Sequence, residues 1–282
     1  MTKELNKSLT RLVVSKVSDI SRFKKEFING LHILLNGNYV KYDIDNLIYN
    51  DKSINISDDA FQKVLSNINE KSEKRKSNGV YYTPNDVAKY IICNSIINRL
   101  IFDNKNTHNY EECIKILSNL SNDKTNQLLY KLKTIDPTCG SGEFLLNIFE
   151  LKYNIMKKTN KINDNNILKI CDTIHGNDID EESTDISKIR LYFCISNRLK
   201  NKKSFEKLAK ILKNNFYNYD FISESNKINN MFDLIIGNPP YVEYARYSLK
   251  EKLVNNYGNI YADVIRNSID LLNDKGVLGY II

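Results

Sequence analysis

Hydrophobic residues recur at helical spacing through the first part of the chain. Over residues 1–75 they fall at positions i, i+3 and i+4, which predicts amphipathic helices. Examples are Phe23, Phe27, Ile28, Leu31 and Leu34. A polar, charged stretch at residues 71–78 follows, and it reads either as a solvated linker or as a basic rim. We therefore expect a helical N-terminal extension over residues 1–75 and a second domain over residues 76–282.

From residue 79 onward, short apolar runs alternate with helical patterns. The strand candidates are residues 134–135, 173–174, 216–217, 234–236 and 277–282. Strands that alternate with helices predict an α/β fold in which helices cover both faces of a parallel, doubly wound sheet. The last candidate strand reaches the final residue, so we expect a core that is incomplete at its C-terminus.

Composition and charge narrow the class of protein. The 282 residues are 41% hydrophobic and 27% charged, as in ordinary globular proteins. The net charge of +7 suits a polyanionic partner, or it reflects surplus solvated lysines. The five cysteines and three histidines form no pattern of metal ligands, and no apolar run has the length of a signal peptide or a membrane span. We expect a cytoplasmic protein with reduced thiols, no metal and no membrane contact.

Asn238-Pro239-Pro240-Tyr241 directly follows the apolar run at residues 233–237. Two successive prolines restrict φ and donate no backbone N–H, so the chain there forms a stiff rim of carbonyl acceptors. An amide side chain and an aromatic ring flank that rim. This combination suits a planar amino group, which needs acceptors for its hydrogens and a ring to stack on. The alternative interpretation is an ordinary loop that leaves a buried strand.

A glycine turn, residues 136–142, lies between a strand candidate and a helical pattern. Gly140 and Gly142 let the backbone approach a ligand closely. No Gly-Lys-Ser/Thr follows, and the spacing departs from GxGxxG, so neither a P-loop nor an NAD site is indicated. Asp136 beside this turn suits a ligand that carries an ammonium group. A generic strand-to-helix turn is the competing interpretation.

Two further carboxylates follow strand candidates. Asp178 comes after the second one, where an acidic side chain can accept from both hydroxyls of a ribose. Asp180 is the competing candidate for that role. Asp220 and Phe221 follow the third strand candidate, and they offer an acceptor for an adenine amino group and a ring to pack on its face.

The motifs, in chain order, are Tyr81-Tyr82-Thr83-Pro84, Asp136-Pro137-Thr138-Cys139-Gly140-Ser141-Gly142, Asp178-Ile179-Asp180, Asp220-Phe221 and Asn238-Pro239-Pro240-Tyr241. Together they resemble the N6-adenine-specific DNA methyltransferases, in the group of type I modification subunits and fused type II restriction–modification enzymes. The resemblance covers about residues 75–282. It implies a Rossmann-like methyltransferase core, S-adenosylmethionine as cofactor and double-stranded DNA as partner.

The resemblance also implies which residues contact the cofactor. Thr83 and Thr138 would contact its methionine end, Asp178 would hold the ribose, and Ile179 would lie near the adenine. The full implied set is Thr83, Asp136, Thr138, Gly140, Gly142, Asp178, Ile179, Asp220, Phe221 and Asn238.

On the target side, the implied catalytic set is Asn238, Pro239, Pro240 and Tyr241. The Asn238 side chain and the Pro239 carbonyl would accept from the amino group of an adenine flipped out of the duplex, and Tyr241 would stack on that base.

Two alternatives stay open. Methyltransferases that act on a protein glutamine or on RNA share the Asn-Pro-Pro-Tyr motif, although residues 81–84 and the Asp-Pro-Thr-Cys turn resemble the DNA group. The chain can also be a truncated or partner-dependent subunit, inactive alone, that lacks the final strands and the target-recognition domain. In that case a C-terminal partner chain or a specificity subunit would complete it.

Overall fold

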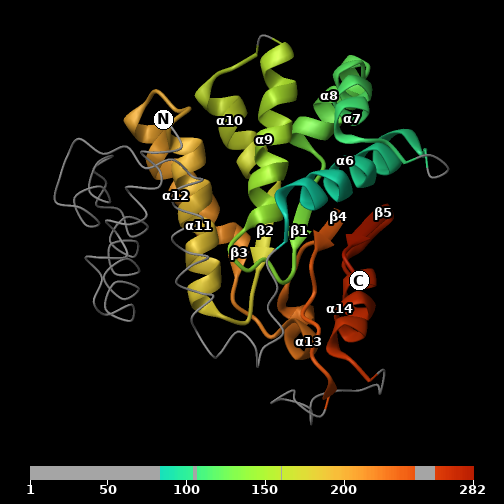
Figure 1. The fold of residues 1–282 in the computed structure, drawn as a ribbon. Helices are drawn as coiled ribbons and strands as arrows, with labels where there is room; N and C mark the ends of the chain where they lie inside the picture. The colour runs from blue at the N-terminus through green and yellow to red at the C-terminus, as the bar shows by residue number, and fades with distance from the viewer. Residues whose placement is uncertain (1–82, 104–106, 160, 245–257) are drawn as a thin grey trace, which may run out of the picture. The chain divides into compact units, whose positions relative to one another are not determined.

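The computed structural model describes residues 83–103, 107–159, 161–244 and 258–282 (Figure 1). The predicted helical extension over residues 1–75 lies outside the described residues, as do Tyr81 and Tyr82. No described helix combines the length and the hydrophobicity that a membrane span requires. The described helices are α6 (Asn85–Ile101), α7 (Tyr110–Ser118), α8 (Asn122–Tyr130), α9 (Glu143–Lys158), α10 (Asp164–Cys171), α11 (Glu181–Ser196), α12 (Lys202–Asn215), α13 (Phe221–Glu224), α14 (Ile260–Ile269) and the 3-10 helix η1 (Ser225–Lys227).

Five parallel strands form one sheet in the order β3-β2-β1-β4-β5. They are β1 (Thr134–Asp136), β2 (Ile174–Asn177), β3 (Phe216–Tyr217), β4 (Phe232–Gly237) and β5 (Leu272–Tyr280). The chain moves outward from β1 to β3 and then returns to the other side of β1 as β4. The predicted doubly wound α/β fold is therefore confirmed. Its topological switch point lies between β1 and β4.

The start of β5 differs from the prediction. The sequence pattern places the strand at residues 277–282 with residues 273–276 as the preceding turn, whereas the observed strand begins at Leu272. The turn residues join the strand through an irregularity: the register with β4 shifts between Phe232 and Leu234, and Lys275 has a φ of 58°. An extra loop of chain within a strand keeps the turn residues while the pairing continues on both sides of it.

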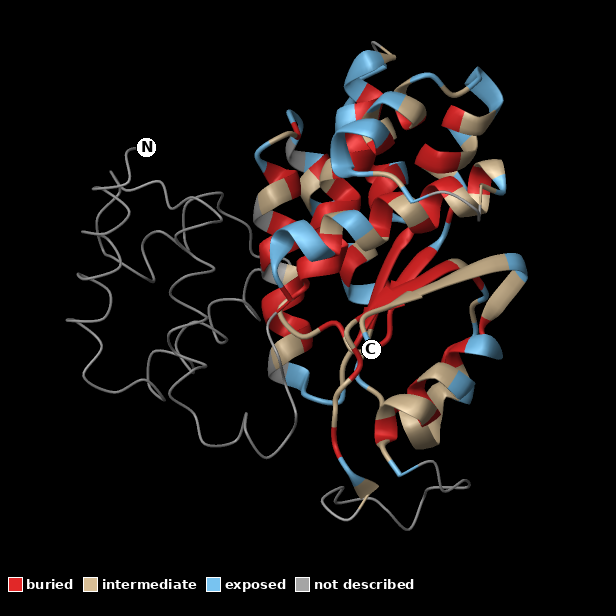
Figure 2. Cartoon of the chain, turned by 45° about the vertical axis from the view of Figure 1, so that its right-hand side comes forward, coloured by how far each residue is buried: buried red, intermediate tan, exposed pale blue. Residues whose placement is uncertain are grey.

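Helices cover both faces of the sheet (Figure 2). Gly279 of β5 lies against Ser95 and Ile91 of α6, on the same face as Ile236 of β4. The neighbouring residue, Ile235, points to the opposite face because side chains alternate along a strand. There it joins a buried apolar cluster with residues of α13 and α14. That cluster is Ile135, Phe221, Ile228, Phe232, Ile235, Val264 and Leu271.

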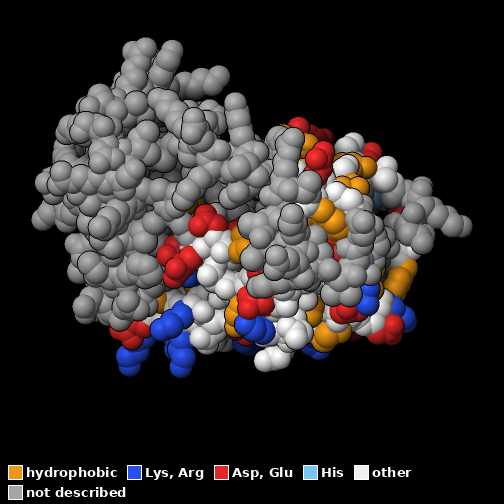
Figure 3. Space-filling view, turned by 90° about the horizontal axis from the view of Figure 1, so that it is seen from below, with side chains coloured by type: hydrophobic (Ala, Val, Ile, Leu, Met, Phe, Trp, Pro, Cys, Tyr) orange, Lys and Arg blue, Asp and Glu red, His pale blue; other side chains and the backbone are white. Residues whose placement is uncertain are grey.

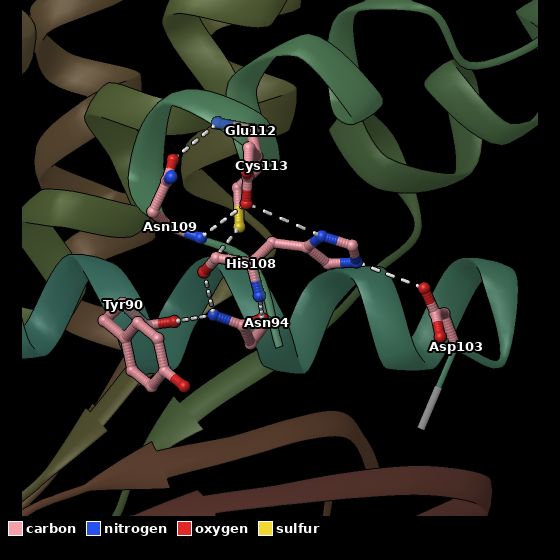
Figure 4. Close-up of polar contacts among 7 residues, drawn as sticks. All are labelled: Tyr90, Asn94, Asp103, His108, Asn109, Glu112 and Cys113. Atoms are coloured by element: carbon pink, nitrogen blue, oxygen red, sulfur yellow. Dashed lines mark hydrogen bonds and ion pairs between the residues drawn. The ribbon is translucent and has the colours of Figure 1, made fainter. Parts of the chain in front are cut away.

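Polar contacts fix the far part of α6 to α7 (Figure 4). Asn94 Nδ2 donates to the carbonyls of Tyr90 and His108, both at 2.9 Å, and Asn94 Oδ1 accepts from His108 N at 2.8 Å. His108 Nε2 lies 3.1 Å from Asp103 Oδ2. Asn109 caps α7 in a reciprocal capping box, in which its side chain accepts from the backbone of the third helical residue. These contacts anchor α6 at Asn94, away from the end of the helix that follows Thr83.

Candidate active site

The carboxyl ends of β1 and β4 bring the two central motifs into contact. Thr138 Oγ1 donates to the carbonyl of Asn238 at 3.5 Å, although 100 residues separate the two in the sequence. A Cβ atom on Gly237 would lie 2.5 Å from Asp136 Oδ1, which is too close for any side chain. The glycine that precedes Asn238 therefore permits the close approach of the two strand ends. Ligands of doubly wound sheets bind at such a switch point.

Thr83 brings a third segment to the same place. Asn238 Nδ2 donates to Thr83 Oγ1 at 3.3 Å across 155 residues of sequence. Thr83 is buried, and α6 begins two residues later, after its N-cap residue Pro84. Thr83, Thr138 and Asn238, all predicted as site residues, thus form one hydrogen-bonded cluster.

The glycine turn has the backbone that its glycines allow. Gly140 has a φ of +51° and Gly142 a φ of +82°, both in the left-handed region that a residue with a Cβ avoids. A Cβ on Gly142 would lie 2.9 Å from Ser187 Oγ of α11, so packing excludes a side chain there too. A Cβ on Gly140 would meet no described atom within 4 Å. The turn is therefore packed against α11 at Gly142, whereas no described residue packs on the Cβ position of Gly140.

Asp178 binds the glycine turn. Its Oδ2 accepts from Gly140 N at 2.9 Å, and its Oδ1 accepts from Asp180 N at 3.0 Å. Burial raises the pKa of Asp178 to about 6, although these two hydrogen bonds favour the ionised form and act to lower the pKa. Asp180 is exposed and accepts from Ser183 Oγ at the start of α11. Of the two competing carboxylates, Asp178 is the one that the structure places at the turn.

Asp136, the last residue of β1, is a second carboxylate next to the glycine turn. It is 2% exposed, and its Oδ1 accepts from Thr138 N at 3.1 Å. Burial raises the pKa of Asp136 well above its ordinary value, and the negative charge of Asp178 adds to that rise. A nearby cationic group would favour the ionised form of this carboxyl. In the described part of the chain, no three His, Cys, Asp or Glu side chains are grouped in a way that could hold a metal ion.

The remaining predicted cofactor residues are placed differently from one another. Ile179 is 57% exposed, next to Asp178. Asp220 caps α13, where its two oxygens accept from Ile222 N and Ser223 Oγ. Phe221 is 4% exposed and belongs to the apolar cluster under the sheet. The structure thus leaves Ile179 open to a ligand and surrounds the Phe221 ring with protein side chains.

Asn177 links the loops that follow β1 and β3, although none of the sequence motifs includes it. Asn177 is fully buried; its Nδ2 donates to the carbonyls of Pro137 and Tyr219, and its Oδ1 accepts from Tyr219 N. A polar residue at the end of a buried strand, immediately before Asp178, is the signal that could have identified it. Ser187 is also missed; its Oγ donates to the carbonyl of Gly140 at 2.7 Å.

Residues 238–241 directly follow the carboxyl end of β4. Pro239 is buried, whereas Asn238, Pro240 and Tyr241 are partly exposed. Tyr241 Oη donates to the carbonyl of Ile281 at 2.8 Å, and its ring centroid lies 6.1 Å from that of Tyr261 of α14. Burial raises the pKa of Tyr241. These contacts hold the tyrosine ring beside the Asn238–Pro240 rim.

The described surface around this end of the molecule has no dominant charge. Seen from below the view of Figure 1, basic and acidic side chains lie next to each other on the part of the surface that described residues form (Figure 3). A strong field of one sign would be the mark of a phosphate path. The described residues visible in this view form no such field.

Residues 172–282 match the family model described as Eco57I restriction-modification methylase. In Vibrio sp. (strain 343), the type II methyltransferase M.VspI is 27% identical over 157 residues, which are 54% of this chain and 31% of that protein. The chain thus spans about a third of the length of this relative. These matches confirm the resemblance to methyltransferases of restriction–modification systems.

Solved structures of restriction–modification proteins share the fold. The chain aligns with DrdV, in a cryo-electron microscopy structure of a DrdV–DNA complex, with a TM-score of 0.53 and 10% identity, covering 98% of this chain and 34% of that one. It also aligns with LlaBIII, an ATP-dependent type ISP restriction-modification enzyme bound to DNA, with a TM-score of 0.52, 16% identity and coverage of 98% and 24%. At these identities the likeness concerns the fold alone.

Proposed function

We propose that the chain is the catalytic part of a site-specific DNA methyltransferase of a restriction–modification system. Its reaction is the transfer of a methyl group from S-adenosylmethionine to the N6 amino group of adenine. The observation that carries the proposal is the contact of Asn238 with both Thr83 and Thr138. Through that contact, the segment suited to an amino group lies directly against the turn suited to a methyl donor.

The residues at the turn fit the proposed cofactor. No described residue packs on the Cβ position of Gly140; the Asp178 carboxylate binds its amide, and the exposed Ile179 follows Asp178 in the chain. A carboxylate next to an apolar side chain suits a ribose that carries a flat aromatic base. The carboxyl of Asp136 would attract the ammonium of the methionine end. S-adenosylmethionine, when bound, supplies a methyl group on a positively charged sulfur.

The protein's contribution is the orientation of the amino group. The Oδ1 of Asn238 and the carbonyl of Pro239 would accept from the two N–H hydrogens, which favours a nitrogen lone pair that points out of the plane of the base. Thr83 holds the other end of the Asn238 amide through Nδ2. Correct positioning of reactants can lower a barrier by about 7–11 kcal/mol.

The target base must leave the double helix before its amino group can reach this rim. Tyr241, held through its hydroxyl by the carbonyl of Ile281, would provide the surface on which the flipped base stacks. We also propose that the chain acts in the cytoplasm, where five free cysteines remain reduced.

The test is an assay with S-adenosylmethionine labelled on its methyl group. The full chain is incubated separately with unmethylated genomic DNA, with RNA and with a release-factor protein that carries a glutamine methylation site, and the methylated product is identified by mass spectrometry. We expect N6-methyladenine in the DNA sample. Label in cytosine, in RNA or in protein would contradict the proposal.

Because the relatives are longer, the assay is repeated with a C-terminal partner chain added. Methyl transfer that appears only in the mixture would identify a partner-dependent subunit. Calorimetric titration with S-adenosylmethionine separately measures whether the chain binds the cofactor.

A further inference from the structure

A buried polar network centred on Glu143 lies beneath the glycine turn. Glu143 is the first residue of α9 and is 5% exposed. Its Oε1 accepts from Asn85 Nδ2 at 2.7 Å, and its Oε2 accepts from Arg190 Nη2 at 3.1 Å. Asn147, one helical turn further along α9, donates to Glu143 Oε1 at 3.2 Å. One carboxylate thus joins the first residue of α6 to α9 and α11.

Arg190 connects the same network to the glycine turn. Its guanidinium, 1% exposed, donates both to Glu143 and to the carbonyl of Ser141, which lies between the two glycines. Removing two charges from water is expensive, and a buried ion pair is often no more stable than apolar residues of similar volume. The pair is therefore better explained by the geometry it fixes than by the stability it adds.

The network reaches Asn238 through the beginning of α6. Asn85 is separated from Thr83 only by Pro84, whose ring restricts the backbone between them. Thr83 Oγ1 in turn accepts from Asn238 Nδ2. A shift of Asn85 relative to Glu143 would therefore move the threonine that holds the Asn238 amide.

We infer that Asn85 and Glu143 are positioning residues, which fix Thr83 and hence the Asn238 amide relative to the glycine turn. The inference rests on the proposed methyl transfer at Asn238. The glycine turn is joined to the network through Arg190 and Ser141. Asn238 is joined to it through Thr83 and Asn85. This link therefore sets the distance between donor and acceptor. Misplacement of a reacting group by about 1 Å can cost about 10²-fold in rate.

The principal variant is Asn85→Ala, because Asn85 is exposed and its removal leaves the buried Glu143–Arg190 pair in place. The matched control is Asp86→Ala, which truncates the next residue in the same exposed first turn of α6. Full-length chains are assayed on unmethylated genomic DNA for kcat and for the KM of S-adenosylmethionine. A misplacement of up to about 1 Å corresponds to a loss of up to about 10²-fold in rate.

We expect kcat of Asn85→Ala to fall by about 10–100-fold. Its KM for the cofactor should change little, and Asp86→Ala should resemble the unsubstituted chain. Asn85→Gln, which retains an amide donor, should recover part of the loss. Hydrogen exchange followed by mass spectrometry should show faster exchange at the start of α6 in Asn85→Ala, and unchanged exchange where Asn94 joins α6 to α7.

Equal kcat values for Asn85→Ala and Asp86→Ala would overturn the inference while leaving the proposed function standing. Unchanged exchange at the start of α6 would overturn it as well. A fall in cofactor affinity without a fall in kcat would show that Asn85 serves only the cofactor pocket. If the unsubstituted chain transfers no methyl group, with or without a partner chain, the proposed function fails first and the inference fails with it.

Discussion

The two ends of the same sheet use buried polar groups in different ways. At the amino ends of the strands, Lys152 of α9 is fully buried and donates to the carbonyl of Leu132 at 2.8 Å and to Thr173 Oγ1 at 2.7 Å. Arg99 of α6 pairs with Asp233 at 2.7 Å. These side chains join helices to the residues that begin β1, β2 and β4, so their role is to fix the layers of the fold.

At the carboxyl ends, polar side chains join loops to other loops. Asp178 accepts from the amide of Gly140, and Asn238 donates to Thr83. The glycine turn beside them has a positive φ at Gly140 and Gly142, and a Cβ on Gly140 would meet no described atom within 4 Å. The polar side chains named at the amino ends bond to residues at the start of the strands, whereas those at the carboxyl ends shape a surface that a ligand can share.

Both long helices of one face span the distance between these ends. α6 begins near the site with Asn85 and carries Arg99 in its last turn, and α9 begins with Glu143 and carries Lys152 further along. Each helix is thus attached to polar partners at both the amino and the carboxyl ends of the strands. A rigid connection of this kind lets the structural end stabilise the geometry of the reactive end.

The largest effect should come from Asn238→Ala at the carboxyl end. The substitution removes the proposed acceptor for the target amine, so we expect kcat to fall by about 10²–10³-fold, as for loss of a preorganised hydrogen-bonding group in other active sites. Affinity for S-adenosylmethionine and the midpoint of urea unfolding should stay near those of the unsubstituted chain. Calorimetry and the methylation assay measure the two quantities. A comparable loss of cofactor affinity would contradict the assignment of Asn238 to the amine.

Asp178→Ala should act on the cofactor instead. It removes the proposed acceptor for the ribose and the partner of the Gly140 amide, so we expect the Kd for S-adenosylmethionine to rise by about 10–100-fold. The rate at saturating cofactor should fall less than in Asn238→Ala. Asp180→Ala is the control, because Asp180 contacts Ser183 rather than the turn. If the control weakens binding equally, the choice of Asp178 is wrong.

Lys152→Met tests the amino end. It leaves the Leu132 carbonyl without this buried donor, so we expect the free energy of unfolding to fall by about 1–3 kcal/mol. Cofactor affinity should not change. Lys157→Met, at an exposed position of the same helix, should alter stability by no more than about 0.5 kcal/mol. A variant that keeps its stability but loses cofactor binding would reverse the contrast between the two ends.

The change in stability with pH should have opposite signs for Lys152 at the amino end and Asp178 at the carboxyl end. These effects should be smaller than those of the substitutions above. Burial lowers the pKa of Lys152 from 10.5 to about 7, so between these values the unfolded chain binds more protons than the folded one. Stability from this group therefore rises as pH rises through that window. Burial raises the pKa of Asp178 from 3.8 to about 6, so the folded chain binds more protons there and this contribution falls as pH rises.

Urea unfolding at a series of pH values measures both slopes. Relative to the unsubstituted chain, Lys152→Met should reduce the alkaline slope, and Asp178→Asn should remove the acidic one. An unchanged profile in either variant would show that the group does not titrate differently in the folded state.

Much of the fold follows from local signals in the sequence. Alternating strand and helix patterns predict the parallel doubly wound sheet, because period and turn residues act over a few positions. The start of β5 is not predicted correctly: Leu272 already pairs with Phe232 of β4, and residues 273–276 form an irregularity before the pairing resumes at Val277. The burial of Phe221 is missed for a related reason: the short helix α13 directs that ring into the apolar cluster that includes Val264 of α14.

The candidate site divides in the same way. The sequence by itself determined the residue types at its turns, namely the glycines that permit a positive φ, the prolines that stiffen the rim, and the polar residues that follow strands. Only the tertiary structure decided which of these meet. Thr83, Thr138 and Asn238 touch because β4 returns beside β1, and Glu143 joins Asn85 to Arg190 because α6 and α11 both contact the start of α9. Contacts of this kind depend on strand order and helix packing, which no short stretch of sequence encodes.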